Sequence, residues 1–171
     1  MSMKKIGLFY GTDGGNTHSV ADRIAKELGS ENVEVFDISS STKDKVLEFE
    51  NLIFASATYG SGDLQGDWED VLGDFDANDF VGKTIALVGV GDQDCYSDTF
   101  CDSLFHLYEK VKLAKVIGQT GIEGYEFDET KALVDGKFVG LALDEDNQAD
   151  LTDSRIQNWV RQLKGEGGFT K

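Results

Sequence analysis

The sequence predicts an α/β protein with a doubly wound, five-stranded parallel sheet in the order 2-1-3-4-5 and helices on both faces. Short apolar runs alternate along the chain with segments whose apolar residues recur at helical spacing, and such alternation is typical of β-α units in a parallel sheet. The apolar runs have few polar interruptions, as expected of strands covered on both faces. A length of 171 residues and a hydrophobic content of 40% fit one domain, residues 1–171, with a core of its own.

The expected strands are five apolar segments, residues 6–10, 33–38, 52–57, 84–90 and a fifth that begins at 115–118. Residues 138–143 are either the continuation of the fifth strand or its neighbour. The stretch before them, residues 120–137, is polar and punctuated by glycine. We therefore expect it to loop out as an insertion within the fifth strand.

Helices are expected between the strands, marked by apolar residues within 20–28, 100–111 and 156–163, with short helices at 43–49 and 68–75. In the first of them Val20, Ile24 and Leu28 recur at helical spacing, and Gly29 follows where a C-terminal cap belongs. Thr152 is the expected N-cap of the last helix.

The formal net charge is −16, from 32 acidic and 16 basic residues. Such a surface disfavours nucleic acid and anionic membranes and favours a basic protein partner, although solubility alone would also explain the acidity. No apolar run approaches the roughly 20 residues that span a bilayer, and the start of the chain lacks the pattern of a signal peptide. We therefore expect a cytoplasmic protein.

Cys95 and Cys101 are the only cysteines. Two cysteines in a cytoplasmic chain do not indicate a disulfide framework, and their spacing lacks the further ligands of a zinc site. Cys95 is either an exposed thiol or a buried, inert one. His18 and His106 are far apart in the sequence and are read as non-catalytic, although His18 follows a loop at which it could touch a phosphate.

That loop reads G-T-D-G-G-N-T over residues 11–17 and lies between the first strand and the first helix. Glycines let the backbone N–H groups approach an anion, and the helix N-terminus adds unpaired donors. Residues 7–20 contain no Lys or Arg, so any phosphate here would be held by neutral donors. The loop matches neither the dinucleotide nor the Walker motif, and by itself it could equally be a turn without a ligand.

Two further loops are expected at the same edge of the sheet, because the sheet order brings the carboxyl ends of the first and third strands together. Residues 57–68 follow the third strand and residues 89–96 end the fourth. Tyr59 in the first of these loops and Tyr96 in the second lie beside glycines. Two aromatic residues next to a phosphate site favour a flat ring, and a flavin more than a sugar.

With these loops in place the sequence resembles the long-chain flavodoxins of bacteria, which are FMN-dependent electron carriers. The motifs that carry the resemblance cover most of the chain: K-K-I-G-L-F-Y-G-T at 4–12, G-D-L-Q-x-D-W-E at 62–69, G-x-G-D-Q at 89–93, D-G-K-F-V-G-L-A-L-D-E-D-N-Q at 135–148 and D-L-T-D-x-R-I-x-x-W-V at 150–160. Residues 120–137 match the insertion that distinguishes long-chain members.

The resemblance implies a cofactor site for FMN. The residues implied to hold the phosphate are Thr12, Asp13, Gly14, Gly15, Asn16 and Thr17. Thr58, Tyr59 and Gly60 are implied to face one side of the isoalloxazine ring, with Ala57, Ser61 and Gly62 also in the site. From the third loop, Tyr96 would stack on the other side, Gly91 and Asp92 would meet the pyrimidine edge, and Asp98 is included; Asp146 would approach the ribityl chain.

The resemblance also implies the activity of a low-potential one-electron carrier, which turns over no substrate and shuttles between semiquinone and hydroquinone. The Gly60 carbonyl would rotate to accept a hydrogen bond from the reduced ring, a rotation that glycine allows. The acidic surface would disfavour the second reduction. We expect a monomer whose partners have basic docking faces, for example a pyruvate oxidoreductase or an NADP reductase. The partners are expected to contact this chain around residues 59–67 and 92–98.

Three positions depart from the usual family pattern. Gly14 stands where a threonine usually supplies a hydroxyl to the phosphate, Ala57 stands where proline is frequent, and Tyr59 stands where many members have tryptophan. Because a hydrogen bond to a charged group is worth roughly 1.5–3 kcal/mol, Gly14 is expected to weaken phosphate binding.

Two other kinds of protein fit the sequence less well. A signalling receiver domain shares the sheet order but needs a phosphoacceptor aspartate after the third strand, where this chain has Ala57, Thr58 and Tyr59. A flavin enzyme such as a quinone reductase needs a nicotinamide site and a general acid, and no motif for either is evident.

Overall fold

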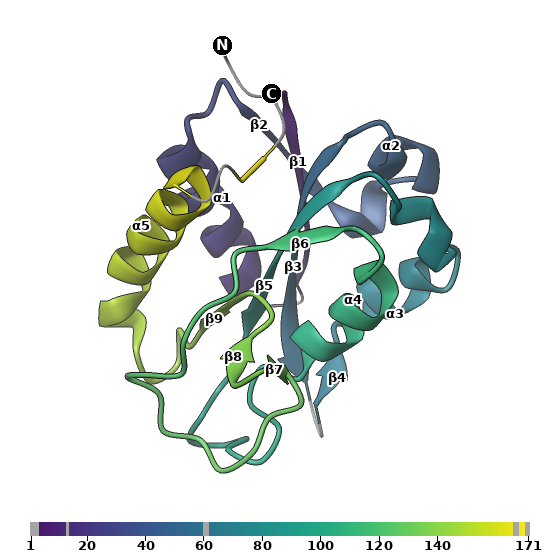
Figure 1. Ribbon diagram of the computed structural model, residues 1–171. Coiled ribbons are helices and arrows are strands. Elements are labelled where there is room, and N and C mark those ends of the chain that lie inside the picture. The colour runs from purple at the N-terminus through teal and green to yellow at the C-terminus, as the bar shows by residue number, and fades with distance from the viewer. Residues whose placement is uncertain (1–3, 13, 60–61, 166–167, 170–171) are drawn as a thin grey trace.

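The computed structural model describes residues 4–12, 14–59, 62–165 and 168–169 (Figure 1). Its central sheet contains β2 (Val33–Asp37), β1 (Ile6–Gly11), β3 (Asn51–Tyr59), β5 (Thr84–Val90) and β6 (Lys115–Ile117), in that order. All four neighbouring pairs are parallel. The predicted order 2-1-3-4-5 is therefore confirmed. The numbering differs because a short antiparallel strand, β4 (Asp63–Leu64), folds back on the end of β3.

The fifth position of the sheet is shared by two short strands. β6 pairs with Thr84–Ala86 of β5, and β9 (Leu141–Leu143) pairs with Val88–Val90, both in parallel. Phe138, which the sequence grouped with this second part, belongs instead to β8 (Lys137–Phe138), which forms a hairpin with β7 (Leu133–Val134). The chain enters β9 through Gly140, where a Cβ atom would lie 2.1 Å from the Leu87 carbonyl oxygen.

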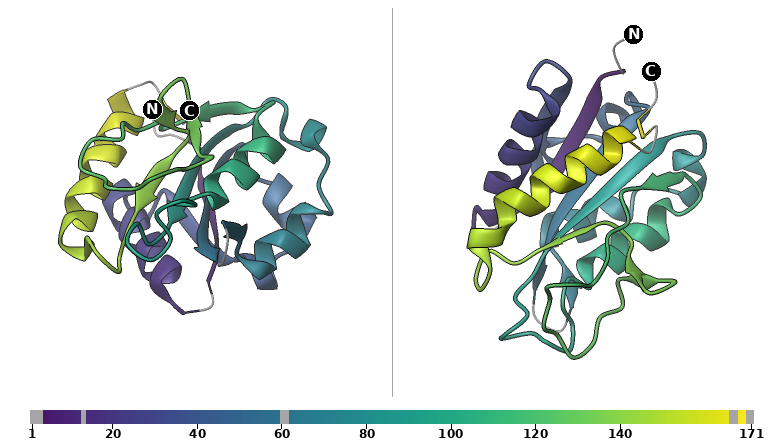
Figure 2. Two further views of the ribbon diagram at one scale, coloured as in Figure 1. Left: turned by 90° about the horizontal axis from the view of Figure 1, so that it is seen from below. Right: turned by 60° about the vertical axis from the view of Figure 1, so that its left-hand side comes forward.

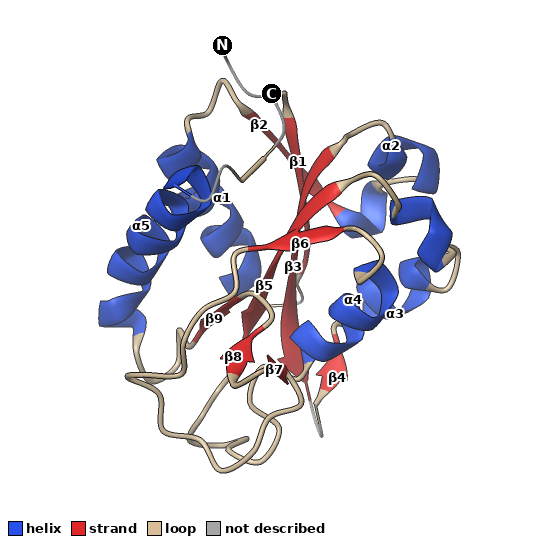
Figure 3. Cartoon of the chain, in the orientation of Figure 1, coloured by secondary structure: helices blue, strands red, loops and turns tan. Residues whose placement is uncertain are grey.

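Helices cover both faces of the sheet (Figures 1 and 3). One face carries α1 (Asn16–Leu28) and α5 (Ala149–Gly165), which lie side by side in both views of Figure 2. The other face carries α2 (Lys43–Leu47), α3 (Gly66–Leu72) and α4 (Ser103–Val111), with two short 3₁₀ helices at Ile38–Ser40 and Ala77–Phe80. Each helical layer has its own apolar core against the sheet.

The core residues follow the predicted periodicity. Val20, Ile24 and Leu28 are buried on the inner side of α1, and Trp159 is buried on α5. Gly29 caps α1 as expected, with a φ of 100° and its N–H donated to the Lys26 carbonyl. No helix in the described part of the chain is both long enough and apolar enough to cross a membrane.

Three predicted helix starts were wrong. α5 begins at Ala149, so Thr152 is a buried residue inside the helix and not its N-cap; its hydroxyl donates to Glu145 Oε2 (3.1 Å). α4 begins at Ser103 and not at residue 100, because Cys101 has a φ of 52°, which a right-handed helix excludes. α3 begins at Gly66, where the Gln65 side chain accepts the N–H groups of residues 67 and 68.

Candidate functional site

A pocket of about 500 Å³ lies at the edge of the sheet where the parallel strands end. Four loops form it, because β1, β3, β5 and β9 all run toward this edge and each is followed by a turn. The lining residues are Thr12, Gly14, Asn16 and Thr17 after β1; Ala57, Thr58 and Tyr59 at the end of β3; Val90, Gly91, Asp92 and Tyr96 at the end of β5; and Asp146 after β9.

The structure thus brings most of the predicted cofactor residues together in one pocket, although their contact with a cofactor remains a prediction. Among the described residues, Gly15, Gly62 and Asp98 were predicted and do not line it. Asp13, Gly60 and Ser61 lie outside the described residues, and with them the proposed rotation of the Gly60 carbonyl. Val90 lines the pocket and was missed, because its position inside an apolar run gave no sign that the strand ends there.

The end of the pocket formed by α1 offers unpaired donors. Gly15 is the N-cap of α1 with a φ of 92°, and no side chain in the described part of the chain caps the helix. The Gly15 N–H donates to Thr12 Oγ1 (2.8 Å), which leaves the Thr12 hydroxyl hydrogen free to donate elsewhere. Thr17 Oγ1 is buried and has no hydrogen-bond partner among the described residues. Buried polar atoms are rarely left unpaired, so these groups fit an anion such as a phosphate.

Gly14 leaves room for a side chain in this wall. A Cβ atom built on Gly14 meets nothing within 4 Å. The residues around Gly14 would therefore leave space for the first atom of a threonine side chain.

The second loop is fixed against α4. The Thr58 hydroxyl donates to Ser103 Oγ (2.7 Å) in the first turn of α4, while Tyr59 pairs with Asp63 in the short antiparallel ladder. Tyr59 is half-buried and Tyr96 is 44% exposed. Both line the pocket, so a flat ligand would have aromatic surface available from two different loops.

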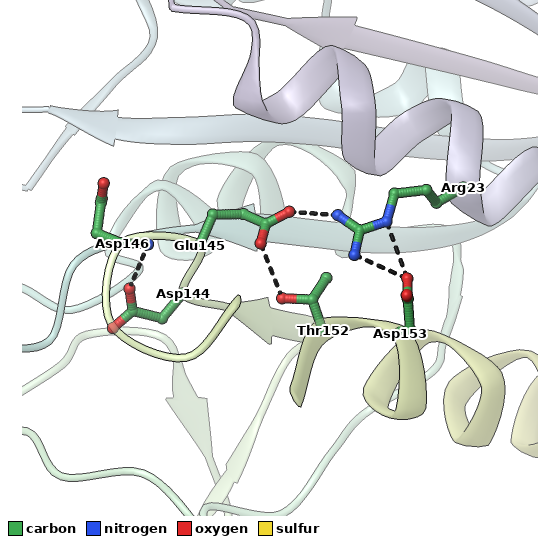
Figure 4. A network of polar contacts seen from close by, with 6 residues as sticks. All are labelled: Arg23, Asp144, Glu145, Asp146, Thr152 and Asp153. Atoms are coloured by element: carbon green, nitrogen blue, oxygen red, sulfur yellow. Dashed lines mark hydrogen bonds and ion pairs between the residues drawn. The ribbon is translucent and has the colours of Figure 1, made fainter. Parts of the chain in front are cut away.

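A web of hydrogen bonds around Asp144 joins the third and fourth loops. Asp144 is fully buried, and its Oδ2 accepts from the Gln93 backbone N–H (3.0 Å) and the Gln93 side-chain amide (2.8 Å). Its Oδ1 accepts from the N–H groups of Asp146 (3.1 Å) and Asn147 (2.9 Å), the first of which is drawn in Figure 4. The Asn147 amide reaches on to Asp92 Oδ1 (2.7 Å).

Sequence reasoning missed the organising roles of Asp144 and Asn147. The only signal was the polar run D-E-D-N-Q directly after an apolar segment. That run is compatible with a loop but could not show that Gln93, 51 residues earlier, would meet it.

Asp92 and Asp146 both line the pocket, and their pKa values are shifted in opposite directions. Partial burial alone would raise the pKa of Asp92, but hydrogen bonds from Cys95 and Asn147 outweigh it and lower the pKa. The pKa of Asp146 is raised by burial and by the negative charges of Asp92, Asp144 and Glu145. Asp92 is thus held as an anion, while Asp146 lies in a repulsive field.

The thiols and histidines lie at the margin of the site or outside it. Cys95 is exposed, and a hydrogen bond and repulsion from Asp92 raise its thiol pKa; Cys101 is buried. The His18 ring stacks on Tyr10 with centroids 4.5 Å apart. Among the described residues His18 does not line the pocket, so its suggested contact with a phosphate is not supported. The ring nitrogen Nε2 of His106 lies 3.1 Å from the Gly62 carbonyl oxygen.

Comparison with known proteins decides the family. The sequence profile described as Flavodoxin matches residues 8–159 of the chain. The chain belongs to the flavodoxin family. The flavodoxin of Helicobacter pylori is 54% identical over 163 residues, which are 95% of this chain and 98% of that protein. The flavodoxin of Nostoc sp. PCC 7120 is 48% identical over 97% of this chain and 99% of its own length.

A solved structure agrees with these sequence matches. The Fusobacterium nucleatum flavodoxin, determined bound to flavin mononucleotide, superposes with a TM-score of 0.90 at 38% identity and covers 96% of this chain and 99% of that chain. The flavodoxin fold predicted from the sequence is therefore confirmed over nearly the whole chain, and the receiver-domain alternative is excluded.

Proposed function

We propose that this flavodoxin binds one FMN non-covalently in the pocket at the sheet edge and carries single electrons between redox proteins at low potential. The observation that carries the proposal is the buried Thr17 hydroxyl without a partner among the described residues, at the uncapped start of α1 and in the same pocket as Tyr59 and Tyr96. The Fusobacterium relative contains the same cofactor. When bound, FMN supplies the one-electron chemistry, which the protein tunes.

The lining residues divide into three groups by the part of FMN that each would meet. Thr12, Asn16 and Thr17 would donate to the phosphate together with the first N–H groups of α1. Tyr59 and Tyr96 would cover the ring, with the backbone at Gly91 along its polar edge. Asp146 would lie beside the sugar-alcohol chain.

The charges around the pocket support a low potential. Among the described residues no Lys or Arg lines it, while Asp92 and Asp146 do. One unit charge about 10 Å away changes the energy of an added electron by about 0.4 kcal/mol in a water-like dielectric. Several carboxylates and the phosphate therefore make the second electron harder to add than the first.

The same charges suggest the partners. A chain with a net charge of −16 attracts proteins with basic docking faces, and association rates should fall as salt rises. A pyruvate oxidoreductase and an NADP reductase are the kinds of partner that we propose. We propose that they dock beside exposed Tyr96 and that the protein acts as a monomer in the cytoplasm.

Titration of the apoprotein with FMN tests this function. We expect a yellow complex of one FMN per chain, weaker binding of riboflavin because it lacks the phosphate, and two separate one-electron steps in potentiometry. A protein that stays colourless with FMN would contradict the proposal. Rapid oxidation of NADPH by the complex with a quinone and without a second protein would favour the flavin-enzyme alternative.

A further inference from the structure

Arg23 connects α1 to the loop that carries Asp146 (Figure 4). Its guanidinium forms an ion pair with Glu145 through Nη1. Its Nε and Nη2 atoms donate to Asp153 Oδ1 on α5, at 2.9 and 2.7 Å. One side chain on α1 therefore holds both the loop after β9 and the first turns of α5.

The two ion pairs of Arg23 differ in their surroundings. The Glu145 side chain is 11% exposed, whereas the Asp153 side chain is 71% exposed. Water screens the Asp153 pair, and such exposed pairs contribute little. The Glu145 pair is sheltered, and its carboxylate is also fixed by the Thr152 hydroxyl (3.1 Å). Removing Arg23 would leave a sheltered charge without its main partner, which is the costly case.

The Glu145 pair joins two elements that each contribute lining residues to the pocket. Asn16 and Thr17 line it from the start of the same helix that carries Arg23. Asp146, the residue next to Glu145, lines it from the other side. Asp144, on the other side of Glu145, holds Gln93 and so fixes the loop of Asp92.

We propose that Arg23 is a positioning residue for the cofactor pocket. Through Glu145 it fixes the loop of residues 144–147 relative to the start of α1, and thereby sets the spacing between the donors for the phosphate and the wall formed by Asp92 and Asp146. This role rests on the proposed binding of FMN. Arg23 itself does not line the pocket among the described residues.

Variants of Arg23 and its partners test this role. Arg23→Met keeps the length of the side chain but removes the charge and the donors. We expect FMN to bind on the order of tenfold more weakly to it, because the loop is no longer fixed in the geometry that binds. The variants Lys26→Met and Asp153→Asn are matched controls, one removing an exposed cation from the same helix and the other the exposed partner. Both should bind within about twofold of the unaltered protein.

A double variant separates positioning from charge. If Arg23 only neutralised Glu145, then Arg23→Met combined with Glu145→Gln would recover the original affinity, and that result would overturn the proposal. Positioning predicts that the double variant stays as weak as Arg23→Met alone. Arg23→Lys, which keeps the charge and one donor, should recover part of the affinity.

Hydrogen exchange gives a readout that needs no cofactor. The backbone N–H groups of Gln93, Asp146 and Asn147 donate hydrogen bonds to Asp144. In the apoprotein of Arg23→Met they should exchange faster, while the N–H groups in the middle of β3 should exchange at an unchanged rate. Equal FMN affinity in Arg23→Met and Lys26→Met, or unchanged exchange at these three residues, would overturn the positioning role. Failure of the unaltered protein to bind FMN would instead overturn the proposed function.

Discussion

At the α1 end of the pocket a buried hydroxyl has no partner among the described residues, whereas at the β9 end the buried carboxylate of Asp144 already accepts hydrogen bonds from the chain. The Thr17 hydroxyl is buried without a partner among the described residues, while the Asp144 carboxylate accepts five hydrogen bonds. A region that leaves buried donors unpaired loses stability unless a ligand arrives. A region that satisfies them in advance holds its shape before the ligand arrives. The α1 end of the pocket is thus suited to binding a ligand, whereas the β9 end is rigid without one.

The largest expected effect comes from breaking the rigid end. Asp144→Ala would leave several buried donors without an acceptor, so we expect the apoprotein to lose about 3 kcal/mol of unfolding free energy. Urea denaturation measures this loss. Asp144→Asn, which keeps the volume and one acceptor oxygen, is the matched control and should lose less. Equal stability of Asp144→Ala and the unaltered protein would mean that the web is not structural.

A second change distinguishes the α1 end from the β9 end, because it should weaken FMN binding without lowering the stability of the apoprotein. Thr17→Val removes the unpaired hydroxyl at nearly constant volume. We expect FMN to bind more weakly by about 2 kcal/mol, the value of a hydrogen bond to a charged group, while the apoprotein is equally stable or more stable. Calorimetric titration and thermal unfolding measure the two quantities. Riboflavin is the control ligand, and its affinity should not change.

A third change would strengthen the binding end. Gly14→Thr adds the hydroxyl that the resemblance leads us to expect at this position, where a Cβ atom meets nothing within 4 Å. We expect FMN affinity to rise by about 1 kcal/mol, less than a full charged hydrogen bond because the new side chain loses rotamer freedom. Gly14→Ala is the control without a hydroxyl. A gain of the same size in Gly14→Ala would assign the effect to the backbone instead.

The smallest expected effect is the change in folding stability with pH that Asp146 causes. The raised pKa of Asp146 means that its ionisation opposes folding, so the penalty appears as pH rises through that raised pKa. Asp146→Asn should therefore stabilise the apoprotein at neutral pH, by less than about 0.5 kcal/mol because Asp146 is exposed and screened. The gain should shrink as the pH falls below the raised pKa. Stability curves of both proteins between acid and neutral pH measure it.

Asp92 should behave in the opposite way. Its pKa is lowered, so its ionised form stabilises the fold above the ordinary pKa of an aspartate, and this contribution is lost as the pH falls through the lowered pKa. Asp92→Asn is thus the matched comparison for Asp146→Asn. The same sign of effect at neutral pH in both variants would contradict the contrast between these two carboxylates.

The sheet and the α1 end of the pocket were predictable from the sequence, because both depend on local patterns. Buried strands appear as apolar runs, and the turn at residues 11–17 carries its glycines and hydroxyls in consecutive positions. The start of α5 was misplaced because the helix extends beyond its apolar stripe into a polar turn at Ala149. Thr152 therefore resembled a cap although it lies inside the helix.

The β9 end could not be predicted, because it depends on contacts between distant residues. Asp144 meets Gln93 only after β5 and β9 have paired, and Arg23 meets Glu145 only after α1 and α5 have packed together. Neither acidic residue has a neighbour in the sequence that indicates its partner. Without such a signal, single acidic residues in a very acidic sequence are interpreted as solvent-exposed side chains.

The division of the fifth strand has a consequence for engineering. β6 and β9 pair with successive parts of β5, so the sheet edge is complete on either side of the segment between them. The tip of that segment, at Asp135 and Gly136 between β7 and β8, is exposed and has positive φ at both residues. We expect a peptide epitope or a fluorescent reporter inserted at this tip to leave the pairing of β5 with β6 and β9 unaltered. This flavodoxin therefore offers a graft point within its chain for labelling or surface attachment.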